Sequence, residues 1–370
     1  MVSVLAAAAF YAPFLLHAPS LGIIPFGGNG MERVYGMWDG PKFITVAATL
    51  WDLNPDNPAY AWWPIPPFDH ADRFPLYPLL IRALSPLLGY WVSSLAISVA
   101  ASTGVTLALY GFLRRMGSSP TEAFWVALVS IFWPPRGLLY RYVTMAEPLF
   151  ILGILGAAYA FKTRRYLLCG LIGALAVATR SNGFLVVAGF GLMAIGQVWA
   201  TRDRGFWSAV FRIRGMLLIP LSLGGIYLWD QLWFGDWLAS LHAHEAVWPE
   251  ASLYPALVYP SFGASGEGVP YLFVLVLAGI VELVRRGHGD LAALSLIFYG
   301  PSLFVPTDVS RYLLPILPFT FSLAGARFLA SVPIRVALLL SLPLVYAYAW
   351  TTLLHPNYQA QFDALYRLLR

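Results

Sequence analysis

The sequence predicts an all-α, polytopic membrane protein with about eleven transmembrane helices, and three observations lead to this prediction. Of 370 residues, 59% are hydrophobic and only 11% are charged. So few charges cannot solvate the surface of a globular domain. The mean hydropathy of +0.68 also indicates a chain that is too apolar for an ordinary soluble domain. Apolar stretches of roughly 17 to 25 residues, which is long enough to cross a bilayer as a helix, recur along the chain.

The predicted spans share this length and apolar character, although the segments 120–135 and 166–179 are short for a crossing. They cover approximately residues 2–25, 88–113, 120–135, 143–161, 166–179, 182–201, 213–233, 269–286, 290–306, 311–329 and 332–353. The first has neither a basic leader nor a small-residue cleavage site, so we expect it to be retained. No repeat or soluble domain stands out, and residues 1–370 are expected to form one membrane domain.

The basic residues predict the orientation, because successive loops alternate between the two sides of a bilayer. Tight turns on one side would hold Arg114, Arg115, Lys162, Arg164, Arg165, Arg202, Arg204, Arg212, Arg214, Arg285, Arg286, Arg327 and Arg335, whereas most acids fall on the other side. The positive-inside rule then predicts a cytoplasmic N-terminus and acidic external loops. The net charge of +5 follows from this topology and gives no reason to expect nucleic acid.

Two external segments, about 26–87 and 234–268, are too long to be turns, and long segments of this kind are usually functional or disordered. Both are rich in aromatic residues, which argues against disorder. In the first segment, residues 31–50 are predicted to form a helix along the membrane interface, and Pro75 suits the first turn of another that continues through Leu88. We expect the first segment to carry the catalytic groups and the second to cover the substrate site.

Asp39, in the run Trp38-Asp39-Gly40, is the leading catalytic candidate. A carboxylate can act as the general base for a sugar hydroxyl, especially if partial desolvation raises its pKa toward neutrality. A helix N-cap, or an ion pair with Lys42 or Arg33, is the alternative interpretation.

Several arginines near the external ends of spans are candidates for binding an anionic lipid phosphate. Arg180 and Arg311 are the strongest, because each adjoins serine and other small residues that leave room for phosphate oxygens. Arginine at membrane depth needs an anionic partner, and the protein offers Glu147, Asp308 and Asp230 for that role. Structural ion pairs remain an open alternative for each arginine. Further substrate-site candidates are Trp38, Lys42, Asp69, His70, Arg73, Tyr77, Glu147 and Arg141.

His242 and His244 in the second external segment leave three interpretations open, namely a metal site, a phosphate or hydroxyl contact, and a structural role. Histidines two positions apart share a face only in extended structure, and no clear further ligands follow, so no metal and no other cofactor is expected. We find no nucleotide-binding glycine loop, no HExxH and no GxSxG motif.

The order of motifs along the chain resembles that of the PIG-V-like mannosyltransferases, a family of the GT-C class of polytopic glycosyltransferases. The motifs are Trp38-Asp39-Gly40, Phe74-Pro75-Leu76-Tyr77-Pro78, Ala146-Glu147-Pro148-Leu149-Phe150, Thr179-Arg180-Ser181-Asn182-Gly183, Phe234-Gly235-Asp236 and Ser310-Arg311-Tyr312. The resemblance implies transfer of mannose from dolichyl or another polyprenyl phosphate mannose to a glycan or glycolipid acceptor on the non-cytoplasmic face. It also implies that Asp39, the acid of the first external loop, is the catalytic base.

The expected partners are thus the prenyl phosphate sugar, the acceptor and membrane lipids. Only two of the 23 basic side chains are lysines (Lys42 and Lys162), which favours a prokaryotic cell membrane over the endoplasmic reticulum. Three alternatives to the mannosyltransferase remain, a lipid or solute transporter or flippase, a non-catalytic membrane subunit, and a related enzyme that uses another prenyl phosphate sugar.

Overall fold

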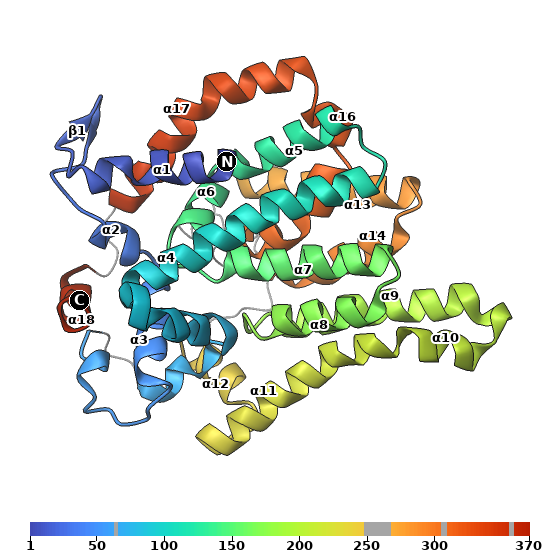
Figure 1. The fold of residues 1–370 in the computed structure, drawn as a ribbon, viewed down its shortest axis with the longest axis horizontal. Coiled ribbons are helices and arrows are strands. Elements are labelled where there is room, and N and C mark those ends of the chain that lie inside the picture. The colour runs from blue at the N-terminus through green and yellow to red at the C-terminus, as the bar shows by residue number, and fades with distance from the viewer. Residues whose placement is uncertain (63–65, 248–267, 305–308, 355–358) are drawn as a thin grey trace.

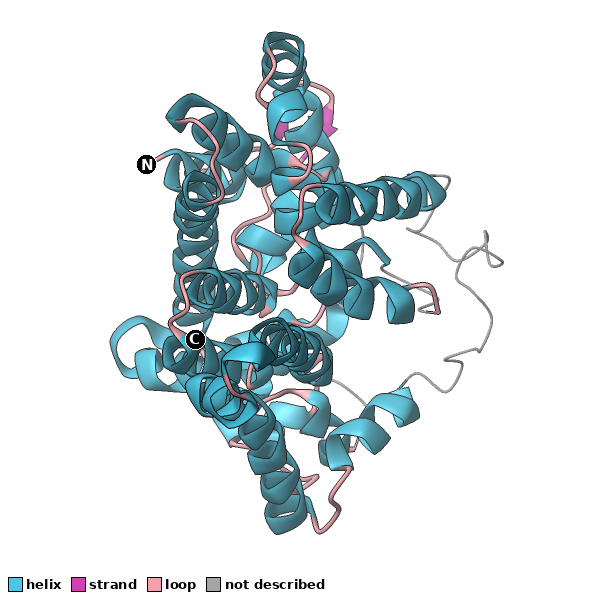
Figure 2. Ribbon diagram, turned by 90° about the vertical axis from the view of Figure 1, so that its right-hand side faces the viewer, coloured by secondary structure: helices cyan, strands magenta, loops and turns pink. Residues whose placement is uncertain are grey.

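A computed structural model of the chain describes residues 1–62, 66–247, 268–304, 309–354 and 359–370. This part of the chain is nearly all-α, and its β-structure consists of the short antiparallel pair β1 (Ser20–Leu21) and β2 (Ile24–Pro25) (Figure 2). The all-α prediction is therefore confirmed.

The first half of the chain forms the helices α1 (Val2–Leu15), α2 (Glu32–Tyr35), α3 (Gly40–Thr49), α4 (Leu76–Arg115), α5 (Pro120–Phe132), α6 (Pro135–Tyr142), α7 (Glu147–Lys162) and α8 (Tyr166–Val177). The second half forms α9 (Gly183–Thr201), α10 (Phe206–Ile213), α11 (Leu218–Phe234), α12 (Ala239–Val247), α13 (Gly268–Arg285), α14 (Gly289–Ser302), α15 (Val309–Leu313), α16 (Ala326–Leu329), α17 (Val332–Leu354) and α18 (Gln359–Leu368). Short 3-10 helices are η1 (Pro58–Tyr60), η2 (Pro67–Asp72), η3 (Arg202–Arg204), η4 (Arg214–Leu217) and η7 (Leu314–Ile316), and Pro318–Leu323 is a π-helix.

Within the described residues, four helical segments are long and apolar enough to cross a membrane. They are α4, α9, the segment 206–234 and α17, and the pair α6 and α7, bent by 101°, makes a fifth if it counts as one span. Shorter apolar helices are α1, α5 and α8. Long apolar helices of this kind fit a membrane protein. The predicted count of about eleven spans is not confirmed.

The first predicted span, residues 2–25, is wrong as a single helix. α1 ends at Leu15, and His17 takes a left-handed backbone conformation with a φ of 45°. The chain then turns into β1 and β2. By contrast, the boundary predicted near Leu88 is confirmed, because Gly89, with φ 74° and ψ 163°, interrupts the helical backbone of α4.

Close approach of small residues packs the helices together. α7 lies against both α4 and α8, and a Cβ on Gly153 of α7 would be 2.7 Å from that of Ala176 in α8. Small residues commonly allow such approach between helices in membranes. Figure 1 shows α4, α7, α8 and α9 running side by side, with α2, α3 and α18 gathered at one end of the bundle and α10 at the other.

Ion pairs join turns that are distant in the sequence. Lys162, at the end of α7, pairs with Asp290, at the start of α14, at 2.6 Å. Asp39, just before α3, and Glu147, at the start of α7, both pair with Arg311 of α15.

Candidate functional site

The run Trp38-Asp39-Gly40 lies at a break between two helices, so the continuous helix predicted for residues 31–50 is wrong. α2 ends at Tyr35 and α3 begins at Gly40. Trp38 has a φ of 47°, a left-handed conformation that a bulky residue rarely adopts and that stops the helix. Asp39 occupies the N-cap position of α3, but its side chain makes no capping hydrogen bond, so the carboxylate is available for other partners.

Gly40 is required by close packing. A Cβ at this position would lie 2.6 Å from the carbonyl oxygen of Tyr35 and 3.1 Å from the Cβ of Thr144. Thr144 belongs to the sharp break between α6 and α7, where Ser94 of α4 hydrogen-bonds to its hydroxyl at 3.0 Å. The glycine therefore seats Asp39 directly beside the start of α7.

Three cations surround the Asp39 carboxylate. Arg311 Nη2 lies 2.7 Å from Oδ2, and Arg73 Nη2 and Lys42 Nζ lie 3.2 and 3.9 Å from Oδ1. Burial raises the pKa of this carboxyl, but attraction to Arg73, Arg311 and Lys42 outweighs burial and holds the pKa well below its usual value. A pKa raised toward neutrality, the condition under which Asp39 would be an especially good general base, is therefore not met in this arrangement. The ion pair with Lys42 is confirmed, whereas Arg33 donates to Asn29 instead.

Glu147 connects the two arginines predicted to bind phosphate. Its Oε1 accepts from Nη1 of Arg180 and from Nε of Arg311, and its side chain is only 4% exposed. Oε2 has no hydrogen-bond partner among the residues that the structure describes. The prediction that Glu147 pairs with these arginines is confirmed. Asp230 instead accepts from the amide of Ser240, and Asp308 lies outside the described residues.

Arg73 extends the cluster toward η2. It pairs with Asp72 through Nη1 and lies over the ring of Phe43, 5.5 Å from its centroid. Lys42 is buried, and burial together with the nearby Arg73 guanidinium lowers its pKa. The arginines of this cluster are already paired with Asp39, Asp72 and Glu147, so a phosphate would have to compete with these carboxylates for them.

His70 is buried in η2, stacked on Tyr60 with ring centroids 5.4 Å apart. Within the described part of the chain, neither ring nitrogen has a hydrogen-bond partner. Burial, with Arg73 and Lys42 nearby, lowers the pKa of His70 to about 3, so the imidazole is neutral at physiological pH. Asp69 is partly exposed, and burial and the neighbouring Asp72 raise its pKa.

An aromatic wall flanks the cluster on the α6 side. Trp38 stacks on Tyr140 with ring centroids 4.9 Å apart, and Arg136 lies over the Trp38 ring at 5.2 Å. Arg311 in turn lies 6.0 Å from the centroid of Tyr140. The sequence-based list missed Tyr140 and Asp72. Asp72 could have been predicted as a site residue because it is next to Arg73 in the sequence. Nothing in the sequence indicated that Tyr140 would contact Trp38.

Tyr77 and Arg141 take other partners. Tyr77 is fully buried and hydrogen-bonds to Ser98 Oγ at 2.9 Å and to the Ser94 carbonyl at 3.0 Å. Arg141 donates to the carbonyl oxygens of Ser130 and Ser102 at 3.0 and 3.4 Å. These hydrogen bonds hold neighbouring parts of the bundle together. Tyr77 and Arg141 therefore have structural partners next to the site.

His242 pairs with an acid of the same external segment. It is an exposed residue on α12, and its Nδ1 is 2.6 Å from Asp236 Oδ2. Gly235, with a φ of 73°, ends α11 and turns Asp236 toward α12. The backbone of His244 also lies on α12, but its side chain falls outside the described part of the structure. α12 packs against η2, so this helix is a neighbour of the site's outer loop.

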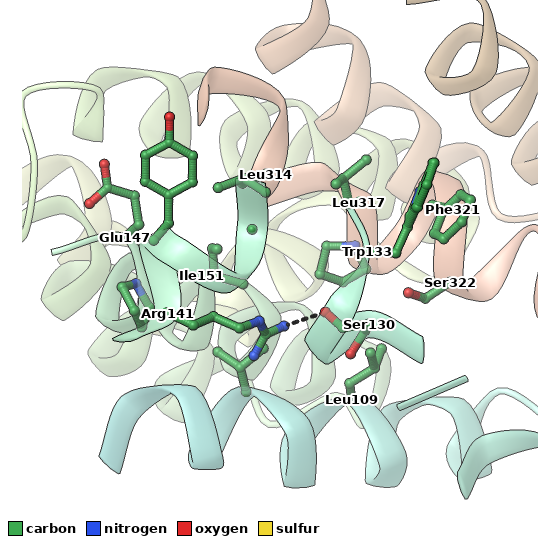
Figure 3. Close-up of a pocket in the computed structure, with 15 residues that line it drawn as sticks. Leu109, Ser130, Trp133, Arg141, Glu147, Ile151, Leu314, Leu317, Phe321 and Ser322 are labelled. Atoms are coloured by element: carbon green, nitrogen blue, oxygen red, sulfur yellow. Dashed lines mark hydrogen bonds between the residues drawn. The ribbon is translucent and has the colours of Figure 1, made fainter. Parts of the chain in front are cut away.

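A narrow cavity adjoins Glu147 and Arg141. Figure 3 shows Arg141 reaching across it to Ser130, with Glu147 at one end and Phe321 and Ser322 at the other. Its volume of about 40 Å³ holds a few water molecules but no sugar.

A second cavity is much larger, at about 820 Å³, and almost entirely apolar. It lies between α5, α13, α16 and α17, and Trp133 and Phe321, stacked at 5.9 Å, line both cavities. Arg136 and Ser310 are among its few polar lining residues. Ser310 precedes Arg311 in the chain, so the polar end of the cavity adjoins the ionic cluster.

In the described part of the chain, no three His, Cys, Asp or Glu side chains are grouped in a way that holds a metal ion. Neither a scan of the chain against protein-family models nor a search of the curated proteins found a match. The chemistry of the site therefore has to be argued from its own geometry.

Proposed function

We propose that this chain is an inverting membrane glycosyltransferase that takes its sugar from a polyprenyl phosphate donor. One observation carries the proposal: Asp39 and Arg311, which are far apart in the sequence, meet at 2.7 Å in a mostly buried cluster of ion pairs that also holds Arg73, Arg180 and Glu147. A carboxylate that can accept a proton thus lies beside guanidinium groups suited to a phosphate. The motif resemblance supports mannose as the sugar, and a glycan or glycolipid as the acceptor.

In the proposed reaction, the oxygen of an acceptor hydroxyl attacks the anomeric carbon while its proton passes to the Asp39 carboxylate. The bond between the anomeric carbon and the phosphate oxygen breaks, and its electron pair leaves with the prenyl phosphate. Arg311 and Arg180 stabilise the negative charge that develops on this leaving group. Asp39 is expected to contribute roughly 10² to 10⁴ in rate as a general base.

A carboxylate with a low pKa is a weak base. For Asp39 to accept the proton, donor binding has to change the charges around it so that its pKa rises. A phosphate that binds Arg311 competes with Asp39 for the same guanidinium. Loss of that partner raises the pKa of Asp39, because the ion pair is one of the contacts that lower it. Donor binding would thereby make the carboxylate a stronger base at the moment when it is needed.

The apolar cavity between α5 and α17 is the proposed site of the prenyl chain. Its volume of about 820 Å³ falls within the usual range of ligand pockets. We further propose the GT-C-like arrangement with about eleven spans, a cytoplasmic N-terminus, the Asp39 cluster on the external face and a prokaryotic cell membrane. The distribution of basic turns supports this orientation.

The direct test is transfer of radiolabelled mannose from a short-chain prenyl phosphate mannose to membrane acceptors, with wild type and Asp39→Asn compared. We expect transfer by the wild type alone. Asp52→Asn is the matched control, because Asp52 lies in the same external segment but binds only its own turn through Asn54 and Asn57. Wild-type turnover by Asp39→Asn would remove Asp39 from the mechanism.

A second candidate is a transporter of lipids or solutes. The observation that favours it is the 101° bend between α6 and α7, with the buried Glu147 at the break, since transporters place binding groups at interrupted helices. Translocation of prenyl phosphate sugar across proteoliposomes in the absence of transfer would favour this candidate over the enzyme.

A further inference from the structure

A third cavity lies at the end of the bundle opposite the Asp39 cluster. Its volume is about 610 Å³, and α9, α10, η4 and the start of α11 enclose it. Figure 1 places α10 at the far end of the bundle from α2 and α3. This cavity is therefore separate from the proposed donor and acceptor sites.

The walls of this cavity are apolar apart from one charged residue. Phe190, Ala194, Val210 and Leu217 are typical of its lining, and Arg214 is the charged group. Both α9 and the segment 206–234 are candidate membrane spans, so the cavity opens within or beside the bilayer. Trp207 is 78% exposed on α10. Lipid is the medium that covers such a surface.

The segment that forms much of the cavity wall is basic in sequence. Residues 199–220 contain four arginines and one acid, Asp203. Arg214 lies 3.6 Å from the centre of the Phe211 ring, and Arg202 lies 4.0 Å from that of Trp199. Arg214 also donates from Nη1 to the carbonyl oxygen of Phe211 at 3.2 Å, and its other N–H groups can donate to an anion.

The backbone around Arg214 is held in place by glycine contacts. A Cβ on Gly170 of α8 would lie 1.8 Å from the carbonyl oxygen of Gly215, and one on Gly215 would lie 2.5 Å from the Cα of Leu167. η4 therefore packs backbone to backbone on α8. This contact fixes Arg214 at the mouth of the cavity instead of leaving it on a loose turn.

We propose that this cavity binds one anionic glycerophospholipid, with an acyl chain between α9 and α11 and the phosphate on Arg214. The inference needs the chain to lie in a membrane but does not depend on the proposed glycosyltransferase activity. Charge complementarity selects the headgroup, because the arginines attract a lipid of net negative charge more strongly than a zwitterionic one, whose phosphate is balanced by its own cation.

Native mass spectrometry of the purified full chain tests the proposal with phosphatidylglycerol and phosphatidylcholine of identical acyl chains. We expect one retained phosphatidylglycerol per chain. Arg214→Gln should weaken that binding about fivefold and leave phosphatidylcholine unchanged, which corresponds to ~1 kcal/mol for one arginine near an anionic headgroup. Arg115→Gln, which removes an exposed arginine from the last turn of α4, is the matched control and should bind like the wild type.

A second variant tests the apolar part of the site. Gly191 lines the cavity, and a Cβ there meets nothing within 4 Å, so Gly191→Phe should fill the space and displace the lipid while every arginine remains. Equal retention of both lipids, unchanged binding in Arg214→Gln, or displacement of the lipid by inorganic phosphate would each overturn the proposal. Retained phosphatidylglycerol binding in Asp39→Asn is expected, so failure of the glycosyltransferase proposal would leave this one standing.

Discussion

Arg311 Nη2 lies 2.7 Å from Asp39 Oδ2, although 272 positions separate the two residues in the chain. The same guanidinium donates through Nε to Glu147, so one side chain joins the first external segment to the start of α7. The predictions that follow test how this contact and its neighbours determine stability and chemistry.

Replacement of Glu147 by Gln should lower the free energy of unfolding by roughly 3 to 5 kcal/mol, because Arg180 and Arg311 lose their shared partner in a buried site. Thermal unfolding in detergent measures the loss. Glu282→Gln is the matched control, since Glu282 also pairs with two arginines, Arg285 and Arg286, but in a far more exposed position.

The Glu282→Gln variant should change stability by about 1 kcal/mol or less. A double-mutant cycle of Glu147→Gln with Arg180→Gln should give a coupling energy of about 0.5 to 3 kcal/mol. Additive effects of the two substitutions would show that this contact contributes no interaction of its own.

Replacement of Arg73 by Gln should raise the pKa of Asp39, because Arg73 is the leading cation that holds it down. If Asp39 is the base, the acidic limb of kcat/KM for sugar transfer should move to higher pH in this variant. In the wild type, the lowered pKa keeps the Asp39 carboxylate ionised even at pH values below its usual pKa. It therefore sets no acidic limb near neutrality. Arg33→Gln, a cation of the same segment bound to Asn29, should leave the profile unchanged.

Replacement of Gly40 by Ala should destabilise the protein by about 1 to 3 kcal/mol, because the new methyl group would overlap the Tyr35 carbonyl and press on Thr144. Transfer should fall as well, since Asp39 must shift. Gly111→Ala is the control, as this α4 position is open, and it should be neutral or stabilising by roughly 0.5 to 1 kcal/mol. Equal unfolding temperatures for the two variants would contradict the close approach at Gly40.

The pH dependence of stability should contain a contribution from His70. Its pKa of about 3 in the folded state lies below the ordinary value of 6.5, so the unfolded chain binds one more proton between these pH values. Stability is therefore fully present above about pH 6.5 and falls as the pH decreases toward 3, by about 1.4 kcal/mol per pH unit within the window.

His70→Phe keeps the stacking on Tyr60 but cannot take up a proton, so its unfolding temperature should depend less steeply on pH than that of the wild type. His17→Asn serves as the control, because His17 is exposed and asparagine tolerates its φ of 45°. A wild-type pH dependence in His70→Phe would show that His70 does not carry this effect.

Several local features were predictable because they depend on nearby residues alone. The apolar composition predicted a helical membrane protein, and Pro75 and Gly89 marked the start of one helix and its interruption. Glu147 was correctly named as a partner of Arg180 and Arg311, since a buried arginine requires an acid. The continuous helices expected over residues 2–25 and 31–50 failed at His17 and Trp38, where tertiary contacts favour a left-handed backbone that the residue types do not announce.

The sequence by itself determined the all-α class, the presence of long apolar helices, and a set of candidate residues that included Asp39, Arg73, Arg180 and Arg311. These follow from hydropathy and charge, which are properties of segments. Only the tertiary structure decided that Arg73, Arg180 and Arg311 meet around Asp39 and Glu147, that the Asp39 pKa is lowered and not raised, and that His242 pairs with Asp236. The physical reason is that the balance between burial and neighbouring charge depends on distances between residues remote in the chain, and packing alone sets those distances.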